Sequence, residues 1–235
     1  MRVRSAAAQP VRRVAATLPR MSAARLRNQL FAPDLFAADP LEQSPRVLFE
    51  DDEGGVRYRP GFIDAVDAQQ WFETLRDAVP WQAQRRPMYD RVVDVPRLVA
   101  AFRLEEPADL PDLPAPLAEA AARLRTELGV PFNTVGLNYY RDGRDSVAPH
   151  NDKLHSLVAG HPIALLSLGA PRRMTIRAKQ PPRQVQHLEL APGSLLLMSH
   201  RSQLHYDHGI PKTREPVGPR ISLAFRVRPL TRSPP

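Results

Sequence analysis

All seven histidines of this 235-residue chain lie between residues 150 and 208. Two patterns among them constrain the fold: a His-Asn-Asp triplet from His150 to Asp152, and a Tyr-Asp-His-Gly stretch that contains His208. In a β-strand, side chains at positions i and i+2 point to the same face, so His150 and Asp152 can bind one ion together. A histidine from a separate strand would complete three ligands. Two imidazoles and one carboxylate on one face of an ion are typical of Fe(II), with open positions for an organic acid and O₂.

The third ligand has three candidates, His200, His205 and His208. We favour His208 because the turn-like sequence Gly209-Ile210-Pro211 follows it directly. His200 and His205 remain as alternatives at this point.

Two arginines six residues apart, Arg220 and Arg226, lie near the end of the sequence. If residues 221–227 form a strand, the even spacing puts both arginines on one face together with Ser222, and the alternate apolar residues on the other. Guanidinium groups on an inner face are costly without an anionic partner, and they pair with carboxylates through two hydrogen bonds. The pattern therefore indicates a site for a dicarboxylate. The alternative is that both arginines are solvated on an edge strand.

Asn138 and Tyr140 repeat this alternation upstream and would offer an amide and a phenol to the same ligand. Taken together, these blocks resemble the AlkB-type Fe(II)/2-oxoglutarate-dependent dioxygenases. The resemblance covers about residues 131–228, in the same order and with similar spacing. The matching blocks are residues 138–143, 150–152, 162–169, 193–198, 208–211, 219–220 and 225–226.

The resemblance implies a double-stranded β-helix, or jelly roll, that uses Fe(II), 2-oxoglutarate and O₂. It implies conversion of 2-oxoglutarate to succinate and CO₂ with hydroxylation of an N-alkyl carbon, after which an aldehyde and the repaired base are released. Ser222 stands where the family often has asparagine, so its contact with the co-substrate has a shorter reach. By position, the resemblance assigns iron to His150, Asp152 and His208, the distal carboxylate of 2-oxoglutarate to Arg220 and Tyr140, and the iron-side carboxylate to Asn138 and Arg226.

A weaker resemblance extends upstream to a substrate-side segment. Family members that repair bases place a stacking aromatic residue soon after its Pro-Arg element, but residues 103–115 here contain four acids and no aromatic residue. Stacking on an aromatic side chain contributes ~1–3 kcal/mol per base, and Phe102, Tyr89 or Trp81 would have to supply it. The substrate-side candidates are Tyr89, Arg91, Arg97 and Phe102.

The resulting prediction is an oxidative dealkylase that acts on alkylated DNA or RNA. One alternative is a 2-oxoglutarate oxygenase that acts on a protein side chain or a small molecule, and another is a cupin-like barrel without activity. Nothing in the sequence indicates an obligate protein partner, so a monomer is expected.

The net charge of +8 is concentrated at the beginning of the chain. Residues 1–33 hold seven arginines and no acid, which leaves a net charge of +1 for the remainder. One further basic cluster lies in a region without acids, residues 170–188. On a hairpin this cluster would either contact phosphates, which supply most non-specific affinity for nucleic acids, or be solvated. It consists of Arg172, Arg173, Arg177, Lys179 and Arg183.

The length suits one α+β domain, a jelly roll with N-terminal buttressing helices. Helical spacing of apolar residues predicts a helix over residues 67–78, before Pro80, and a second over residues 116–128, which Gly129 ends. Strands are predicted at residues 46–50, 132–140, 163–168, 174–178, 186–190, 194–198 and 221–227. The predicted organisation is a flexible basic extension (1–30), a helical and substrate-side segment (31–130), the jelly-roll core (131–228) and a tail (229–235).

The sequence contains no cysteine, which excludes disulfides and thiolate ligands and suits a cytoplasmic protein. No apolar run approaches the ~18 residues that span a membrane, so no membrane association is expected. Residues 1–33 lack the apolar stretch of a secretory signal, although their composition resembles a mitochondrial-type transit peptide. A disordered extension, or a start at Met21, is the favoured interpretation.

Overall fold

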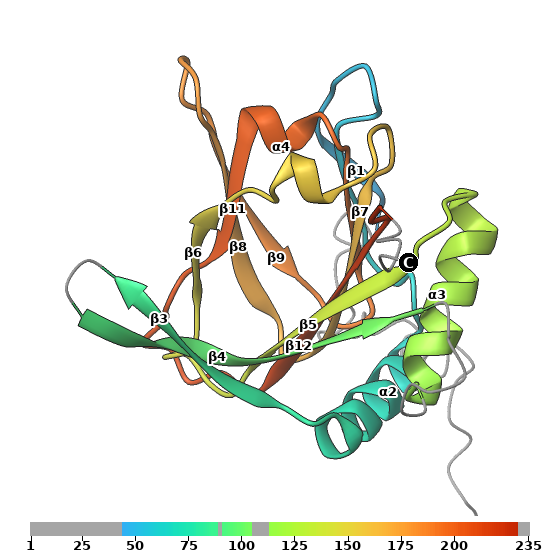
Figure 1. Ribbon diagram of the computed structural model, residues 1–235, viewed down its shortest axis with the longest axis vertical. Coiled ribbons are helices and arrows are strands. Elements are labelled where there is room, and N and C mark those ends of the chain that lie inside the picture. The colour runs from blue at the N-terminus through green and yellow to red at the C-terminus, as the bar shows by residue number, and fades with distance from the viewer. Residues whose placement is uncertain (1–43, 89–90, 105–112, 230–235) are drawn as a thin grey trace, which may run out of the picture. The chain divides into compact units, whose positions relative to one another are not determined.

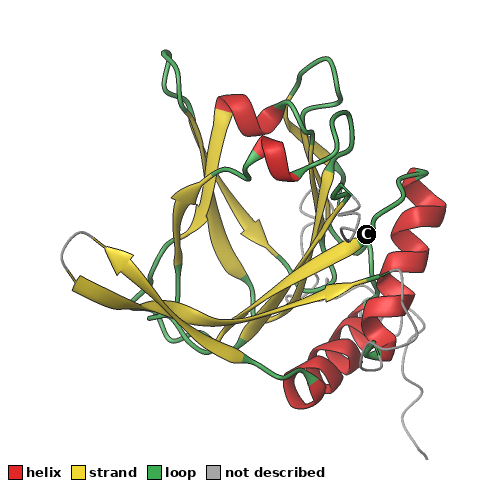
Figure 2. Cartoon of the chain, viewed as in Figure 1, coloured by secondary structure: helices red, strands yellow, loops and turns green. Residues whose placement is uncertain are grey.

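The computed structural model describes residues 44–88, 91–104 and 113–229, except for the side chains of residues 86–91. The chain divides into two units, Met1–Ala38 and Asp39–Pro235, and the described residues all belong to the second. In this part of the chain, two antiparallel β-sheets are accompanied by helices (Figures 1 and 2). No helix among the described residues is long and apolar enough to cross a membrane.

The larger sheet has the strand order β1-β2-β10-β7-β12-β5-β4-β3. Strand β12 pairs with β5 on one side and β7 on the other, so its two arginines lie in the middle of the sheet. The alternative of two solvated arginines on an edge strand is therefore wrong. The strands are β1 (Arg46–Phe49), β2 (Val56–Arg59), β3 (Gln82–Met88), β4 (Arg91–Arg103), β5 (Thr134–Tyr140), β7 (Ile163–Gly169), β10 (Leu195–Met198) and β12 (Arg220–Arg226).

The smaller sheet has the order β6-β11-β8-β9. Its apolar side chains, among them Met174, Ile176 and Leu188, pack against Leu165 and Leu196 of the larger sheet. The two sheets therefore enclose a shared apolar core. The strands are β6 (Val147–His150), β8 (Arg172–Ala178), β9 (Val185–Leu190) and β11 (Tyr206–Ile210).

Strand β7 is buried on both faces, which explains its apolar sequence, in which Ser167 is the one polar side chain. Ile163 and Leu165 belong to the core between the sheets, whereas Leu166 and Leu168 pack with the helices on the opposite face. The alternation of side chains along a strand accounts for this division. The larger sheet is thus covered on both sides at its centre.

Helices α2 (Ala65–Ala78) and α3 (Ala115–Leu128) pack on the larger sheet through their apolar stripes (Figure 1). The carboxylate of Asp64 caps α2 by accepting hydrogen bonds from two backbone N–H groups, and the helix ends two residues before Pro80. Helix α3 ends at Gly129, which adopts the left-handed conformation with a φ of 64°. Both helices hold the sheet from the side away from the second sheet.

The predicted fold class, an α+β jelly roll with buttressing helices, is confirmed. Both predicted helices and all seven predicted strands are present, with ends displaced by at most two residues. Strand β2 and the β3–β4 hairpin were not predicted, and for β6 and β11 the sequence indicated that the histidines lie on strands but not where those strands begin and end. Strand β4 was not predicted because it contains Pro96, and proline lacks the N–H that pairing with a neighbouring strand needs. The strand accommodates it in a bulge of its own, where residues 95–97 lie opposite the single residue Gln84 of β3, before the ladder with β5 begins.

Candidate active site

The small sheet brings together the two histidines that the sequence singles out. Strands β6 and β11 pair in a register that places His208 directly opposite His150. The two imidazole rings lie with their centroids 4.5 Å apart. Of the three candidates for the third ligand, His208 is thus the one whose ring lies against His150, whereas His205 is exposed in the short helix α4 (Ser202–His205).

The close approach of β6 explains why the residue after His208 is a glycine, Gly209. A Cβ atom at this position would lie 2.8 Å from the carbonyl oxygen of Val147 and 2.9 Å from the nitrogen of Pro149. These are backbone atoms of β6 and cannot move aside cheaply. The missing side chain therefore allows β11 to approach β6 closely enough for the two imidazoles to meet.

His208 is buried, with 6% of its surface exposed. Burial, followed by the charge of His150, lowers the pKa of His208 to about 3. The imidazole is therefore neutral at physiological pH. Neutral imidazole is the form that binds a metal ion, so the environment of His208 suits a ligand.

Asp152 lies near both histidines but is engaged by Arg226. Its Oδ2 accepts a hydrogen bond from Nε of Arg226 at 2.6 Å. Burial acts to raise the pKa of Asp152, but the charge and hydrogen bond of Arg226, with smaller contributions from His208 and His150, hold it below the ordinary value. The carboxylate is therefore ionised and positioned by β12. Among the described residues, no three His, Cys, Asp or Glu side chains are arranged to hold an ion, and Asp152 is paired with Arg226.

A cavity of about 400 Å³ connects the histidines to the arginines of β12. Its lining contains both imidazoles together with residues from both sheets. Five of the residues predicted to bind the co-substrate are among them: Asn138, Tyr140, Arg220, Ser222 and Arg226.

Arg220 is the most unusual group in this cavity. Its side chain is 1% exposed, and Nη2 donates a hydrogen bond to Oγ of Ser167 at 2.8 Å. Its Nε and Nη1 are buried and have no hydrogen-bond partner among the described residues. Burial lowers the pKa of Arg220 to about 10, so it is still charged near neutral pH. A buried guanidinium with two unused donors fits an anionic ligand, and a carboxylate of 2-oxoglutarate would satisfy it.

Tyr140 lies close to two guanidinium groups. Its ring is 5.3 Å from the guanidinium carbon of Arg220 and 5.6 Å from that of Arg172. Burial raises the pKa of the phenol, so it keeps its proton and can donate a hydrogen bond. Tyr140 and Arg220 thus offer neighbouring donors to the same cavity.

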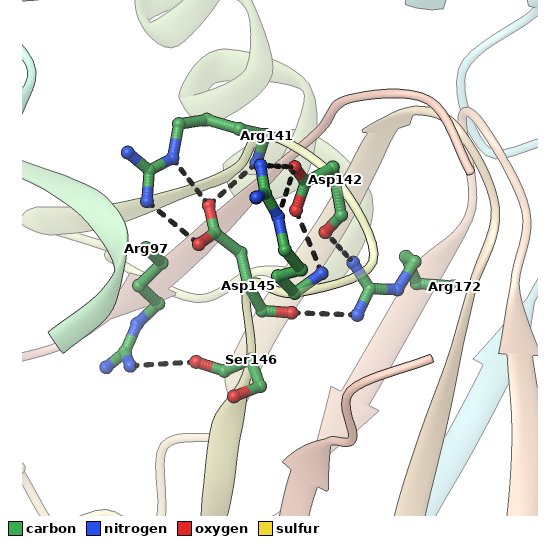
Figure 3. A network of polar contacts seen from close by, with 7 residues as sticks. Arg97, Arg141, Asp142, Asp145, Ser146 and Arg172 are labelled. Atoms are coloured by element: carbon green, nitrogen blue, oxygen red, sulfur yellow. Dashed lines mark hydrogen bonds and ion pairs between the residues drawn. The ribbon is translucent and has the colours of Figure 1, made fainter. Parts of the chain in front are cut away.

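Arg172 holds the loop that follows Tyr140 (Figure 3). Its guanidinium donates hydrogen bonds of 2.9 Å each to the carbonyl oxygens of Asp142, Asp145 and Pro211. It is 3% exposed, so neither alternative for the basic cluster, phosphate contact or solvation, holds for Arg172. The signal was present in the sequence, because alternation along β8 places Arg172 on the same face as the buried Met174 and Ile176.

Replacing Arg172 with methionine is expected to lower the free energy of unfolding by about 1–3 kcal/mol or more, because buried carbonyl oxygens lose their donors. Urea denaturation measures the change. Arg173→Met is the matched control, since Arg173 is the exposed neighbour on the same strand. Equal stability losses in the two variants would contradict the role assigned to Arg172.

The substrate-side candidates have different environments. Arg97 lines the cavity and donates a hydrogen bond to Oδ1 of Asn138 at 2.6 Å. It also donates to the carbonyl oxygen of Ser146 at 3.3 Å (Figure 3). Phe102 packs against the core beneath the helices and does not line the cavity. Tyr89 lies outside the described residues, as does the side chain of Arg91, which begins β4.

Two further aspects of the substrate side differ from the sequence-based expectation. Trp81 stacks on Tyr139, with ring centroids 5.1 Å apart, and packs against the same helical core, so it is not placed to stack on a base. Gln84, Val99 and Ala101 line the cavity from β3 and β4. Sequence reasoning missed these three because the hairpin itself was not predicted.

Comparison with known proteins agrees with this geometry. Residues 55–226 match the model of the 2OG-Fe(II) oxygenase superfamily. DNA oxidative demethylase ALKBH2 from Homo sapiens is 37% identical over 130 residues, which cover 51% of this chain and 50% of the relative. Alpha-ketoglutarate-dependent dioxygenase alkB homolog 3 from Mus musculus is 33% identical over 184 residues, which cover 72% of this chain and 64% of the relative.

Among solved structures, OsALKBH1 shares the fold. The match has a TM-score of 0.50 and 14% sequence identity, and it covers 73% of this chain and 97% of that chain. The chain spans about half to two thirds of the length of the two relatives compared above. The family match extends over most of the chain, from β2 to the end of β12, and includes both histidine-bearing strands. The chain therefore belongs to the 2OG-Fe(II) oxygenase superfamily, the enzymes that use Fe(II) and 2-oxoglutarate, and within it is an AlkB homologue.

Proposed function

We propose that this protein is an Fe(II)- and 2-oxoglutarate-dependent dioxygenase that removes N-alkyl groups from nucleic-acid bases. The observation that carries the proposal is the buried guanidinium of Arg220, which has two unused donors and belongs to a residue that lines the same cavity as the His150–His208 pair. A cation-binding pair and a buried anion site in one cavity match the needs of iron and a dicarboxylate.

The donor set supports a specific division of roles. His150, Asp152 and His208 would hold the iron, while Arg220, Tyr140 and Ser222 would bind the distal carboxylate of 2-oxoglutarate. Asn138 and Arg226 would face its other carboxylate. When bound, iron, 2-oxoglutarate and O₂ together supply the oxidation of an N-alkyl carbon, with succinate and CO₂ as co-products. The hydroxylated product then loses an aldehyde and leaves the repaired base.

The side chains of the protein prepare this chemistry in three ways. Arg226 keeps Asp152 ionised and fixes its orientation through their 2.6 Å contact. The burial of His208 keeps its imidazole neutral and ready to bind. Arg172 holds the loop that follows Tyr140, and its guanidinium carbon lies 5.6 Å from the Tyr140 ring.

The relatives support nucleic acid as the substrate, since ALKBH2 is named as a DNA oxidative demethylase. The exposed arginines of the β8–β9 region, Arg173 and Arg183, could contact phosphates. Arg177 and Lys179 contribute less free charge, because they lie 3.5 and 3.8 Å from the carboxylate of Asp207. We expect the protein to act as a monomer on alkylated DNA or RNA.

The experiment that tests this proposal uses single-stranded DNA and RNA oligonucleotides that carry one N-methylated base. The protein is supplied with Fe(II) and 2-oxoglutarate, and mass spectrometry follows the oligonucleotides. We expect loss of one methyl group from at least one methylated oligonucleotide, and slower loss as salt rises, because phosphate contacts weaken with ionic strength.

An unmethylated oligonucleotide of the same sequence is the control and should keep its mass. If every methylated oligonucleotide stays intact while 2-oxoglutarate is consumed, the dealkylase proposal is wrong. The site would then belong to an oxygenase for a protein side chain or a small molecule.

A further inference from the structure

The segment that carries His150 and Asp152 lies at the end of a four-residue strand, and His150 itself is exposed. Such a short strand does not by itself fix two side chains against a third on another strand. The segment is held in place through Asn151, the residue between the two candidate ligands. The Oδ1 of Asn151 accepts a hydrogen bond of 2.8 Å from Nζ of Lys179.

Lys179 connects this segment to the other side of the site. Its Nζ also donates a hydrogen bond of 2.7 Å to the carbonyl oxygen of Gln203 in α4, and it lies 3.8 Å from Oδ1 of Asp207, the neighbour of His208. Its backbone N–H donates to the carbonyl oxygen of His205 at 2.9 Å. One ammonium group therefore contacts the chain neighbours of all three candidate ligands.

Gln203 provides a second connection from the same side. Its Oε1 accepts a hydrogen bond of 3.0 Å from the backbone N–H of Asp152. The side chain is 2% exposed, and its Nε2 donates to Oγ of Ser202 at 3.1 Å. Because both ends of the amide are engaged in a buried setting, its orientation is fixed.

Helix α4, which carries Gln203, is itself held to the larger sheet. Oγ of Ser199 donates to the carboxylate of Asp51 at 2.6 Å and accepts from the backbone N–H of Ser202 at 2.8 Å. Figure 1 shows α4 immediately before β11 at one end of the small sheet. The contacts thus run from the β1–β2 turn through α4 to Asp152.

We propose that Lys179, together with Gln203, is a positioning residue for the iron ligands and sets the affinity of the site for its metal. This inference rests on the proposed function, because it takes the three residues to be ligands. The physical reason is that hydrogen bonds from a charged donor are about twice as strong as neutral ones. Groups that orient metal ligands typically contribute about 10- to 100-fold to metal affinity.

The test is the dissociation constant for Mn(II), measured by electron paramagnetic resonance on the purified full chain. Lys179→Met is expected to bind Mn(II) about 10- to 100-fold more weakly than the wild type. Lys179→Gln retains a donor and should lie between the two, and Gln203→Met should also weaken binding. Thermal unfolding of each variant shows that the comparison is made on folded protein.

Arg177→Met is the matched control. It removes a positive charge two residues before Lys179 that lies against the same partner, Asp207. Among the described residues, Arg177 makes no hydrogen bond or ion pair with Asn151 or Gln203, so Mn(II) affinity should stay within about 2-fold of wild type. If the wild type binds Mn(II) and the folded Lys179 and Gln203 variants bind it equally well, the positioning role is overturned while the iron site stands. If the wild type itself does not bind Mn(II), the iron site and this inference are both overturned.

Discussion

Asp152→Ala is expected to abolish the turnover of 2-oxoglutarate. The substitution removes one of three candidate iron ligands and the only carboxylate among them, so metal binding loses its charged ligand. It also leaves Arg226 without its 2.6 Å partner in a mostly buried setting. Breaking such a pair is expected to lower the free energy of unfolding by about 3–5 kcal/mol. Succinate formation and urea denaturation measure the two effects.

Asp207→Ala is a suitable control, because Asp207 lies beside His208 but pairs with Arg177 and Lys179 near the surface. It should retain turnover, with a reduction much smaller than that of Asp152→Ala. Turnover by the Asp152 variant at the wild-type rate would show that this carboxylate is not a ligand.

Arg220→Met is expected to weaken the binding of 2-oxoglutarate without lowering the stability of the protein. Without 2-oxoglutarate, the variant should be as stable as the wild type or more stable, because a buried guanidinium with two unpaired nitrogens is replaced by an apolar side chain. Affinity for 2-oxoglutarate should fall by about 2–5 kcal/mol, or roughly 30- to 5,000-fold, because one partner of a buried charge pair is removed. Thermal unfolding with increasing 2-oxoglutarate measures both quantities.

Ser167→Ala provides the comparison for Arg220. It removes the hydrogen-bond acceptor of Nη2 but keeps the charge, so 2-oxoglutarate should still raise the unfolding temperature. A thermal shift in Arg220→Met equal to that of the wild type would mean that the co-substrate binds elsewhere.

The sequence predicts the parts of the molecule in which local pattern and tertiary packing agree. The two-residue alternation from Arg220 to Arg226 correctly puts both arginines on one face, and the His-Asn-Asp and His-Gly patterns identify two strands that do pair. The helix ends follow from local chemistry, with Pro80 after α2 and Gly129 after α3. These features depend only on residues close in sequence.

The features that the sequence did not predict depend on residues far apart. Strand β4 was not predicted because it contains Pro96, which the structure accommodates in a bulge of β4 opposite Gln84. Lys179 and Gln203 look like ordinary polar residues until β8 and α4 are brought beside Asn151 and Asp152. Arg172 was grouped with surface arginines because of its charge, although the alternation of side chains along β8 puts it on the buried face.

The measurement that tests the central claim most directly is succinate formed from 2-oxoglutarate by the iron-loaded protein, with and without an N-methylated single-stranded oligonucleotide, and with Asp152→Ala as the blank. We predict that succinate formation rises with the methylated oligonucleotide and accompanies loss of its methyl group, and that the blank forms none. Succinate formation that is the same in the wild type and in the blank would contradict the account.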